Sequence, residues 1–174
     1  TIDGVSRGFN FFYRAVDTTD LAITDYLVNR SGLTMTHGIP LTEYDYFRTT
    51  IGPESTKIIT GTNTAQEIVD FVNREGERNT ILRWSNSYSH DTRNRTVFPE
   101  SGNLQRIGLE TTIPGSQLSF YKLSYTGKYY HKVFGETIFT VRGNVAYAAP
   151  YGKTTELPFY EKYYAGGINS VRGY

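Results

Sequence analysis

The residues with the most suggestive chemistry lie in the last stretch of this sequence, where an arginine stands beside a glycine in an aromatic-rich segment. Arg172 is followed by Gly173, and the pair Gly166-Gly167 comes a few residues earlier. Paired glycines permit backbone conformations that other residues rarely adopt. A guanidinium offers a planar set of donors that suits a carboxylate or an aromatic ring face. The pattern indicates either a structured loop in which Arg172 joins two parts of the molecule, or an ordinary loop with a surface arginine.

Other candidate chemistry in the sequence is sparse. His37, His90 and His131 are scattered, cysteine is absent, and no metal-binding or nucleotide-binding motif occurs. Glu110 and Glu136 could be offered as a catalytic carboxylate pair, but we interpret them as structural charges. The net charge is +1, which lacks the positive excess typical of nucleic-acid binding. The sequence therefore predicts no enzyme, no metal site, no cofactor and no nucleic-acid partner.

The composition favours strands over helical bundles. The 174 residues include 15 Tyr, 10 Phe and 17 Gly, with one Met and one Trp. Tyrosine-rich and glycine-rich sequences suit strands and interfacial rings. The mean hydropathy is -0.44, and no run of about 18 apolar residues predicts a membrane-spanning helix. Membrane strands escape that test because their apolar residues alternate with polar ones.

Apolar and polar residues alternate along seven stretches, which predicts seven β-strands. The expected strands are 4–16, 33–39, 44–60, 80–91, 103–113, 118–130 and 136–147. We expect Pro53 to interrupt the third of them. Short connections alternate with longer ones, as in outer-membrane barrels. The short ones are 40–43, 94–102 and 131–135, the long ones are 17–30, 61–79 and 148–174, and 114–117 is a tight exception.

Residues 63–75 depart from the strand rhythm. Ala65, Ile68 and Phe71 recur at helical spacing, which predicts one short amphipathic helix. Thr64 with Glu67 fits a capping box, and Gly76 follows as a stop signal. We expect this helix inside a long loop, either packed on its own loop or lying on a membrane surface.

Charges of both signs gather on one face of the predicted strands, while the other face is apolar. A soluble sandwich would turn the apolar face inward, whereas a membrane barrel would turn it outward to lipid. Interleaved charges and aromatic residues near the strand ends favour the barrel. Glu110 is expected to pair with Arg106, and Glu136 with Arg142. The residues expected to face a barrel lumen are Arg106, Glu110, Lys122, Glu136 and Arg142.

The stretch from Pro158 to Tyr174 resembles the sixth extracellular loop of the BamA family of outer-membrane assembly barrels. The shared elements, in order, are Pro158-Phe159-Tyr160-Glu161, Ala165-Gly166-Gly167 and Val171-Arg172-Gly173-Tyr174. Tyr174 stands where that family usually has Phe. A turn of the form Phe-Pro-x-x-Gly at 98–102 is also similar to the family. TamA and the two-partner secretion transporters carry a similar tetrapeptide, but the longer match favours the BamA family.

The resemblance implies an all-β fold, an antiparallel transmembrane β-barrel of sixteen strands. Residues 1–174 would be a partial barrel domain with about the fifth to eleventh strands and extracellular loop 6. The remaining strands and the POTRA domains are expected outside this chain. The loop would fold back into the barrel, where Arg172 contacts acidic and aromatic residues of the wall. The motif residues are Val171, Arg172, Gly173 and Tyr174, and the supporting residues are Pro158, Phe159, Tyr160, Gly166 and Gly167.

The resemblance also implies a function: folding and inserting β-barrel proteins into the outer membrane of a Gram-negative bacterium, without nucleotide hydrolysis. The expected partners are unfolded outer-membrane protein clients, outer-membrane lipids, and accessory Bam lipoproteins bound through the absent POTRA domains. Client strands would pair at a seam between the first and last barrel strands, neither of which is expected here. The alternative is a two-partner secretion or translocation-type transporter barrel of the same superfamily. A passive porin or a soluble binding module is a third possibility.

Overall fold

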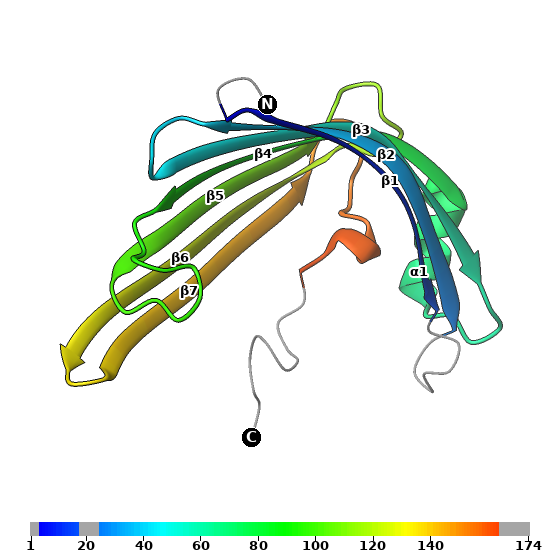
Figure 1. Cartoon of the computed structure of the whole chain (residues 1–174). Coiled ribbons are helices and arrows are strands. Elements are labelled where there is room, and N and C mark those ends of the chain that lie inside the picture. The colour runs from blue at the N-terminus through cyan, green and yellow to red at the C-terminus, as the bar shows by residue number, and fades with distance from the viewer. Residues whose placement is uncertain (1–3, 18–24, 164–174) are drawn as a thin grey trace.

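The computed structural model describes residues 4–17 and 25–163. They form one antiparallel sheet of seven strands in which every strand pairs with its neighbours in sequence. The sheet is bent into an arch (Figure 1). The strands are β1 (Ser6–Asp17), β2 (Tyr26–Pro40), β3 (Asp45–Thr60), β4 (Arg78–Asp91), β5 (Gly102–Thr112), β6 (Phe120–Phe134) and β7 (Thr137–Pro150); the helices are α1 (Gln66–Glu75) and the short 3-10 helix η1 (Phe159–Glu161).

The expected seven antiparallel strands are confirmed, but some boundaries were wrong. β2 begins at Tyr26, so the long polar loop predicted over 17–30 extends too far. The first residues of β2 already alternate between the two faces of the sheet, and Val28 is buried in the core beside Ile58. Pro53 does not interrupt β3, which runs unbroken from Asp45 to Thr60. β6 extends to Phe134, beyond its predicted end at 130, which leaves only Gly135 and Glu136 before β7 begins at Thr137.

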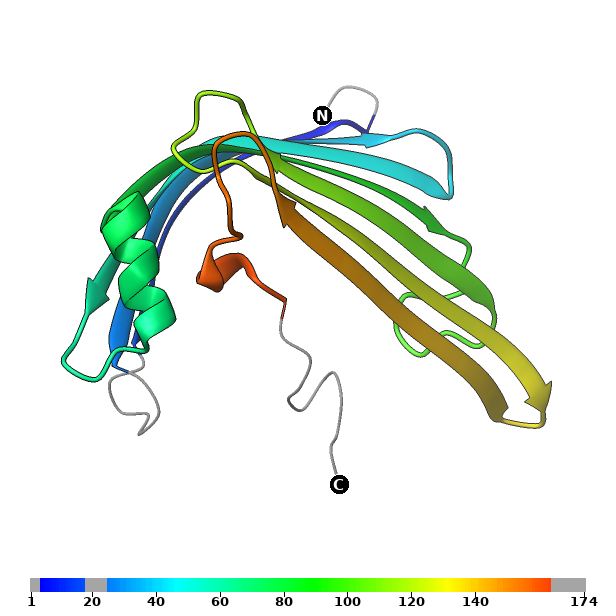
Figure 2. The same cartoon turned by 180° about the vertical axis from the view of Figure 1, so that it is seen from behind.

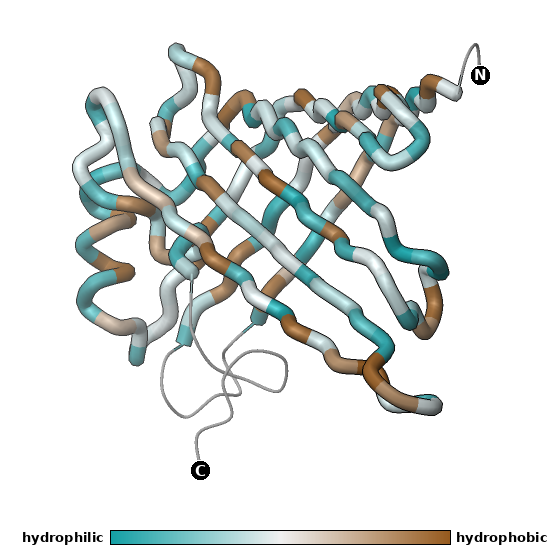
Figure 3. Tube along the Cα trace, turned by 90° about the vertical axis from the view of Figure 1, so that its left-hand side faces the viewer, coloured by the Kyte–Doolittle hydropathy of each residue, from teal (hydrophilic) through white to brown (hydrophobic). Residues whose placement is uncertain are grey.

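The two faces of the sheet have opposite character. The concave face is the side on which α1 and η1 lie (Figures 1 and 2). The convex face carries exposed apolar side chains from every strand, as alternation at period two requires. They include Phe9, Phe11, Tyr13, Leu33, Ile51, Trp84, Ile107, Leu123, Tyr125, Val141, Val145 and Tyr147. Figure 3 shows the alternation of polar and apolar residues along the strands.

The core lies at one end of the concave face, where the sheet meets α1 and η1. It contains buried side chains from four strands and from both helices, and Leu118 comes from the connection before β6. Its members are Val28, Ile58, Ile68, Phe71, Ile81, Leu118, Phe120 and Phe159. Most apolar strand residues are absent from this core because they stand on the exposed convex face. Burying apolar area stabilises a fold by roughly 25 cal/mol per Å², so the contact of η1 and α1 with the sheet contributes such stabilisation at this end.

Helix α1 forms where a helix was predicted, but its start and its packing differ. It is preceded by Ala65, which makes no side-chain cap, so the predicted capping box of Thr64 and Glu67 is wrong. The Thr64 hydroxyl instead donates to the backbone oxygen of Asp25. Gly76 ends the helix as expected, with φ 87°. Phe71 of α1 packs on η1, so the helix rests on the loop that follows β7 rather than on its own. In the described ranges, no helix is long and apolar enough to cross a membrane.

Candidate functional site

The candidate site is built where the segment after β7 turns back under the concave face. Three polar contacts hold the start of this segment against the β5–β6 connection. The Tyr151 N–H donates to the Ser119 backbone oxygen at 2.9 Å, and the Tyr151 hydroxyl donates to the backbone oxygen of Thr112. The Thr154 hydroxyl accepts from the Ser119 N–H at 2.8 Å. Pro158, whose φ is -51°, then leads into η1.

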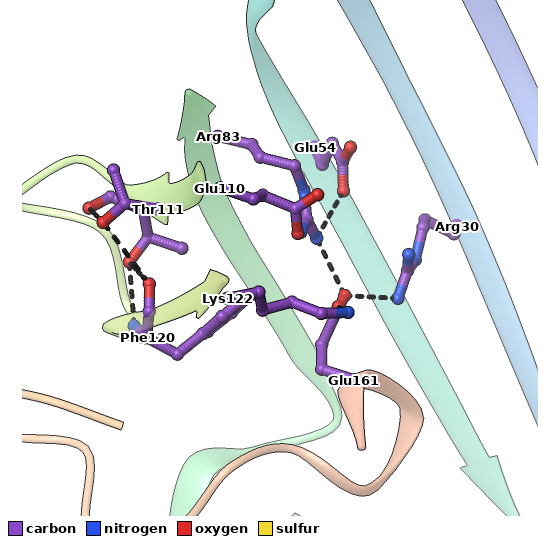
Figure 4. A network of polar contacts seen from close by, with 9 residues as sticks. Arg30, Glu54, Arg83, Glu110, Thr111, Phe120, Lys122 and Glu161 are labelled. Atoms are coloured by element: carbon purple, nitrogen blue, oxygen red, sulfur yellow. Dashed lines mark hydrogen bonds and ion pairs between the residues drawn. The ribbon is translucent and has the colours of Figure 1, made fainter. Parts of the chain in front are cut away.

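Glu161, the last residue of η1, is the centre of the site. Its side chain is only 3% exposed and accepts hydrogen bonds from cations on three strands (Figure 4). Arg30 Nη2 of β2 lies 2.7 Å from Oε1, and Arg83 Nη2 of β4 lies 2.8 Å from the same oxygen. Lys122 Nζ of β6 lies 2.9 Å from Oε2. One carboxylate therefore ties η1 to three strands of the sheet.

Arg83 extends this contact to the two strands in between. Its Nη2 lies 3.0 Å from Glu54 Oε2 on β3, and its Nη1 donates to Glu110 on β5. The Arg83 guanidinium carbon also stands 5.4 Å from the ring centroid of Phe120. We call the set Arg30, Glu54, Arg83, Glu110, Lys122 and Glu161 the Glu161 network. The contact with Glu54 is an ion pair, whereas those of Arg83 with Glu110 and Glu161 are charged hydrogen bonds, which are about twice as strong as neutral ones.

The network fixes the charge state of Glu161. Burial by itself raises the pKa of the Glu161 carboxyl, but the positive charges of Arg83 and Arg30, the hydrogen bond from Arg83 and the charge of Lys122 outweigh it. The net result is a pKa below the ordinary value of 4.5. Burial also raises the pKa of the neighbouring Tyr160 hydroxyl. Glu161 is therefore ionised at neutral pH, as its three cationic partners require.

A pH prediction follows from the lowered pKa of Glu161. A carboxyl whose pKa is lower in the folded than in the unfolded protein stabilises the fold at pH values above its unfolded-state pKa. That contribution is lost as the pH falls through the folded-state pKa. We expect the amide exchange of residues 151–163 in the full-length protein, corrected for intrinsic rates, to be flat from pH 7 to about 5. Local opening of residues 151–163 should increase below pH 4.5, the ordinary pKa of a Glu carboxyl. The variant Glu161→Gln should lack this acid dependence; an equal acid response in both proteins would contradict the assignment.

Aromatic rings join η1 to α1 on the other side of the segment. The Phe159 ring centroid lies 5.4 Å from Tyr26, 5.7 Å from Phe71 and 5.2 Å from Tyr160, each nearly edge-to-face. Such pairs add about 0.5–1.5 kcal/mol beyond the area they bury. Two ion pairs also join α1 to this segment. Arg74 lies 3.1 Å from Glu156, and Lys162 pairs with Glu67. η1 thus connects the helix to the inner surface of the sheet.

The structure brings some of the predicted site residues together and leaves others apart. Pro158, Phe159 and Tyr160 lie at η1, with Pro158 and Phe159 buried. Glu110 and Lys122 belong to the Glu161 network. The expected pair of Glu110 with Arg106 is wrong, since Glu110 bonds Arg83. Glu136 stands in the turn before β7 rather than on the strand. Gly166, Gly167, Val171, Arg172, Gly173 and Tyr174 lie outside the described residues.

The positions of Arg106 and Arg142 follow from the strand register. Arg106 alternates with Glu110 on β5, and Arg142 lies opposite Lys128 of β6, so both belong to the concave face. Among residues 4–17 and 25–163, neither arginine forms an ion pair with a carboxylate. The expected pair of Arg142 with Glu136 is therefore also wrong.

Sequence reasoning misses four central residues of the network. The pattern includes Glu161 only in the Pro-Phe-Tyr-Glu element, predicts a loop at Arg30, and gives no partner for Glu54 or Arg83. The alternation of Tyr26, Val28 and Arg30 could have placed Arg30 on the apolar-core side of a strand. No local signal connects it to Glu161, 131 residues away. Within the described ranges no group of three or more His, Asp or Glu side chains is placed to hold a metal ion.

These features define a class of protein. The sheet is antiparallel and its neighbouring strands pair in order. Its convex face is apolar, and a loop is folded against its charged concave face. This combination is that of a section of an outer-membrane barrel wall. Residues 1–174 match the Omp85 superfamily domain. The chain belongs to the Omp85 superfamily, and it is an outer-membrane protein of a Gram-negative bacterium.

Two relatives show the similarity along the whole chain. The outer membrane protein assembly factor BamA of Neisseria meningitidis serogroup B is 26% identical over 184 residues, covering 100% of this chain and 23% of that protein. The crystal structure of Haemophilus ducreyi BamA lacking POTRA domains 1–3 superposes with a TM-score of 0.87 at 26% identity, covering 99% of this chain and 35% of that one. The chain thus spans about a quarter to a third of the length of these relatives.

Proposed function

We propose that the whole protein to which these residues belong folds and inserts β-barrel proteins into the outer membrane, without nucleotide hydrolysis. The match to an assembly factor along the entire chain supports this proposal. In this proposal residues 1–174 form about the fifth to eleventh of sixteen barrel strands, and the segment after β7 is extracellular loop 6. The partners are unfolded outer-membrane protein clients, accessory Bam lipoproteins bound through POTRA domains outside this chain, and lipids on the convex face. The protein acts as a scaffold rather than as an enzyme.

The observation that carries the proposal for this part of the protein is the burial of Glu161 among Arg30, Arg83 and Lys122. A loop that merely connected two strands outside the membrane would need no buried carboxylate on the concave face. Removing an ion from water costs several kcal/mol unless well-placed partners compensate for it. The network is therefore a brace that keeps the loop inside the arch. In a closed barrel, the concave side would be the lumen, and the concave-face residues Arg106, Glu110, Lys122 and Arg142 would face it.

The proposed activity is tested by insertion of a client barrel into lipid vesicles. The full-length protein with its accessory lipoproteins is reconstituted without nucleotide, and the protease-resistant folded client is measured over time. Acceleration over protein-free vesicles supports an assembly factor. No acceleration, together with passage of a single exoprotein across the vesicle membrane, would support the two-partner secretion transporter instead.

The motif residue Arg172 gives a second prediction about this loop. In the full-length protein, Arg172→Ala should lower the temperature at which the folded barrel loses its heat-modifiable band, and should lower client levels in cells. The reason is that a guanidinium facing a carboxylate and rings in a confined site has no equivalent replacement. Lys153→Ala, an exposed residue of the same segment, is the matched control. Unchanged heat-modifiability and unchanged client levels in Arg172→Ala would remove the proposed role of this residue.

A further inference from the structure

A pocket of about 230 Å³ opens on the concave face next to η1. Its walls come from two strands and from η1, and they combine cations, rings and small apolar side chains. The lining residues are Arg14, Val16, Tyr26, Val28, Arg30 and Tyr160. Only Arg30 among them belongs to the Glu161 network, so the pocket is a separate space beside it.

Two arginines stand directly opposite each other in this pocket. Arg14 of β1 pairs in register with Arg30 of β2, and opposite residues of an antiparallel pair share a face with their Cβ atoms about 4.5–5.5 Å apart. Arg30 is bonded to Glu161 and lies 5.2 Å from the Tyr160 ring centroid. Arg14 is exposed and forms no ion pair with any residue of 4–17 or 25–163. Like charges placed opposite each other destabilise a sheet, so the pocket favours an added negative charge.

The charges around the pocket leave room for one anion. Three of the four nearby cations, Arg30, Arg83 and Lys122, share the carboxylates of the Glu161 network with one another. The network supplies three carboxylates, from Glu54, Glu110 and Glu161. Arg14 is the fourth cation, and no carboxylate of residues 4–17 or 25–163 pairs with it. A ligand with a single negative charge would balance the cluster, whereas a dianion would exceed it.

We propose that this pocket binds a carboxylate carried on a small aromatic or aliphatic body. The planar guanidinium of Arg14 donates to the carboxylate, since this geometry suits two parallel hydrogen bonds. The rings of Tyr26 and Tyr160, with Val16 and Val28, contact the body of the ligand. The carboxylate belongs either to a free small acid or to an acidic side chain of a polypeptide, and both present the same group to Arg14. This inference is independent of the assembly activity.

The test uses the full-length protein in detergent micelles, with phenylacetate as the charged probe and phenylacetamide as its uncharged match. Binding is measured by saturation-transfer NMR and calorimetry in low salt. We expect phenylacetate to bind at least 10-fold more tightly than phenylacetamide, and Arg14→Gln to weaken phenylacetate at least 10-fold. Arg7→Gln is the matched control, because it removes the same charge from the same strand. Arg7 lies seven residues from Arg14 and, by alternation, on the opposite face of β1, so phenylacetate binding should be unchanged.

A second arm identifies the source of the carboxylate. The capped peptide Ac-Gly-Glu-Gly-NH₂ presents a side-chain carboxylate without free termini. Tighter binding of the peptide than of phenylacetate assigns the pocket to a polypeptide side chain, and the reverse assigns it to a small acid; both require sensitivity to Arg14→Gln. Equal binding of phenylacetate and phenylacetamide, or equal binding to the parent protein and to Arg14→Gln, would overturn the proposal.

Discussion

Replacing Glu161 by Gln should release the segment 151–163 from the concave face of the sheet. The substitution keeps the size of the side chain but removes the one negative charge shared by Arg30, Arg83 and Lys122. Breaking a buried ion pair by removing one partner costs roughly 3–5 kcal/mol, because the remaining charges stay buried without compensation. About 3 kcal/mol corresponds to more than 100-fold in an equilibrium constant.

Hydrogen exchange of the full-length protein measures this release directly. The amide of residue 161 donates to the Pro158 oxygen at 2.8 Å, and that of Tyr151 to the Ser119 oxygen at 2.9 Å. Both should exchange on the order of 100-fold faster in Glu161→Gln, up to the limit set by their protection in the parent protein. Glu156→Gln, five residues earlier, removes a carboxylate that is 64% exposed and should change little. Equal exchange in the two variants would show that the network does not hold the loop.

Replacing Phe159 by Ala should separate α1 from the loop. The ring is 7% exposed and packs against Tyr26, Phe71 and Tyr160. Truncating a buried Phe to Ala typically costs about 3–5 kcal/mol, from lost transfer energy and from the cavity left behind. The loss should fall on α1 and η1 together, since Phe159 of η1 packs directly on Phe71 of α1.

The expected signature is faster amide exchange in both α1 and residues 151–163. The Gly76 amide, which donates to the Val72 oxygen at 2.8 Å, reports on the helix. Phe139→Ala is the matched control, because its ring is 54% exposed on β7 and leaves no cavity. If Phe159→Ala loosened the loop but left α1 fully protected, the aromatic contact would not be what holds the helix.

Together the two variants separate the roles of neighbouring residues in η1. Glu161 connects to the sheet through charges, and Phe159 connects to α1 through rings. The 3-10 turn, in which the Glu161 N–H donates to the Pro158 oxygen, keeps the two side chains in one short unit. A change in either contact therefore alters how the loop, the helix and the sheet fit together, which is the geometry on which the proposed lumen brace depends.

Much of the fold could be predicted from the sequence because its signals are local. Alternation of apolar and polar residues predicted the number of strands, and the turns with Pro99 and Gly102 or with Pro114 and Gly115 separated them. The errors occurred where tertiary contacts overrode a local pattern. Tyr26 and Val28 looked like part of a polar loop, yet they are in a strand because they pack on the core. Thr64 suited a capping box, yet its hydroxyl is used by Asp25.

The sequence by itself determined the seven strands, the two faces of each strand and the family resemblance, because these depend on residues a few positions apart. Only the tertiary structure decided which charges meet. Glu161 bonds Arg30, Arg83 and Lys122 from 131, 78 and 39 residues away, and Glu110 bonds Arg83 instead of Arg106. The physical reason is that the strength of a charge pair depends on distance and burial rather than on sequence spacing. The curvature of the sheet and the return of the loop under it set the distances between these groups.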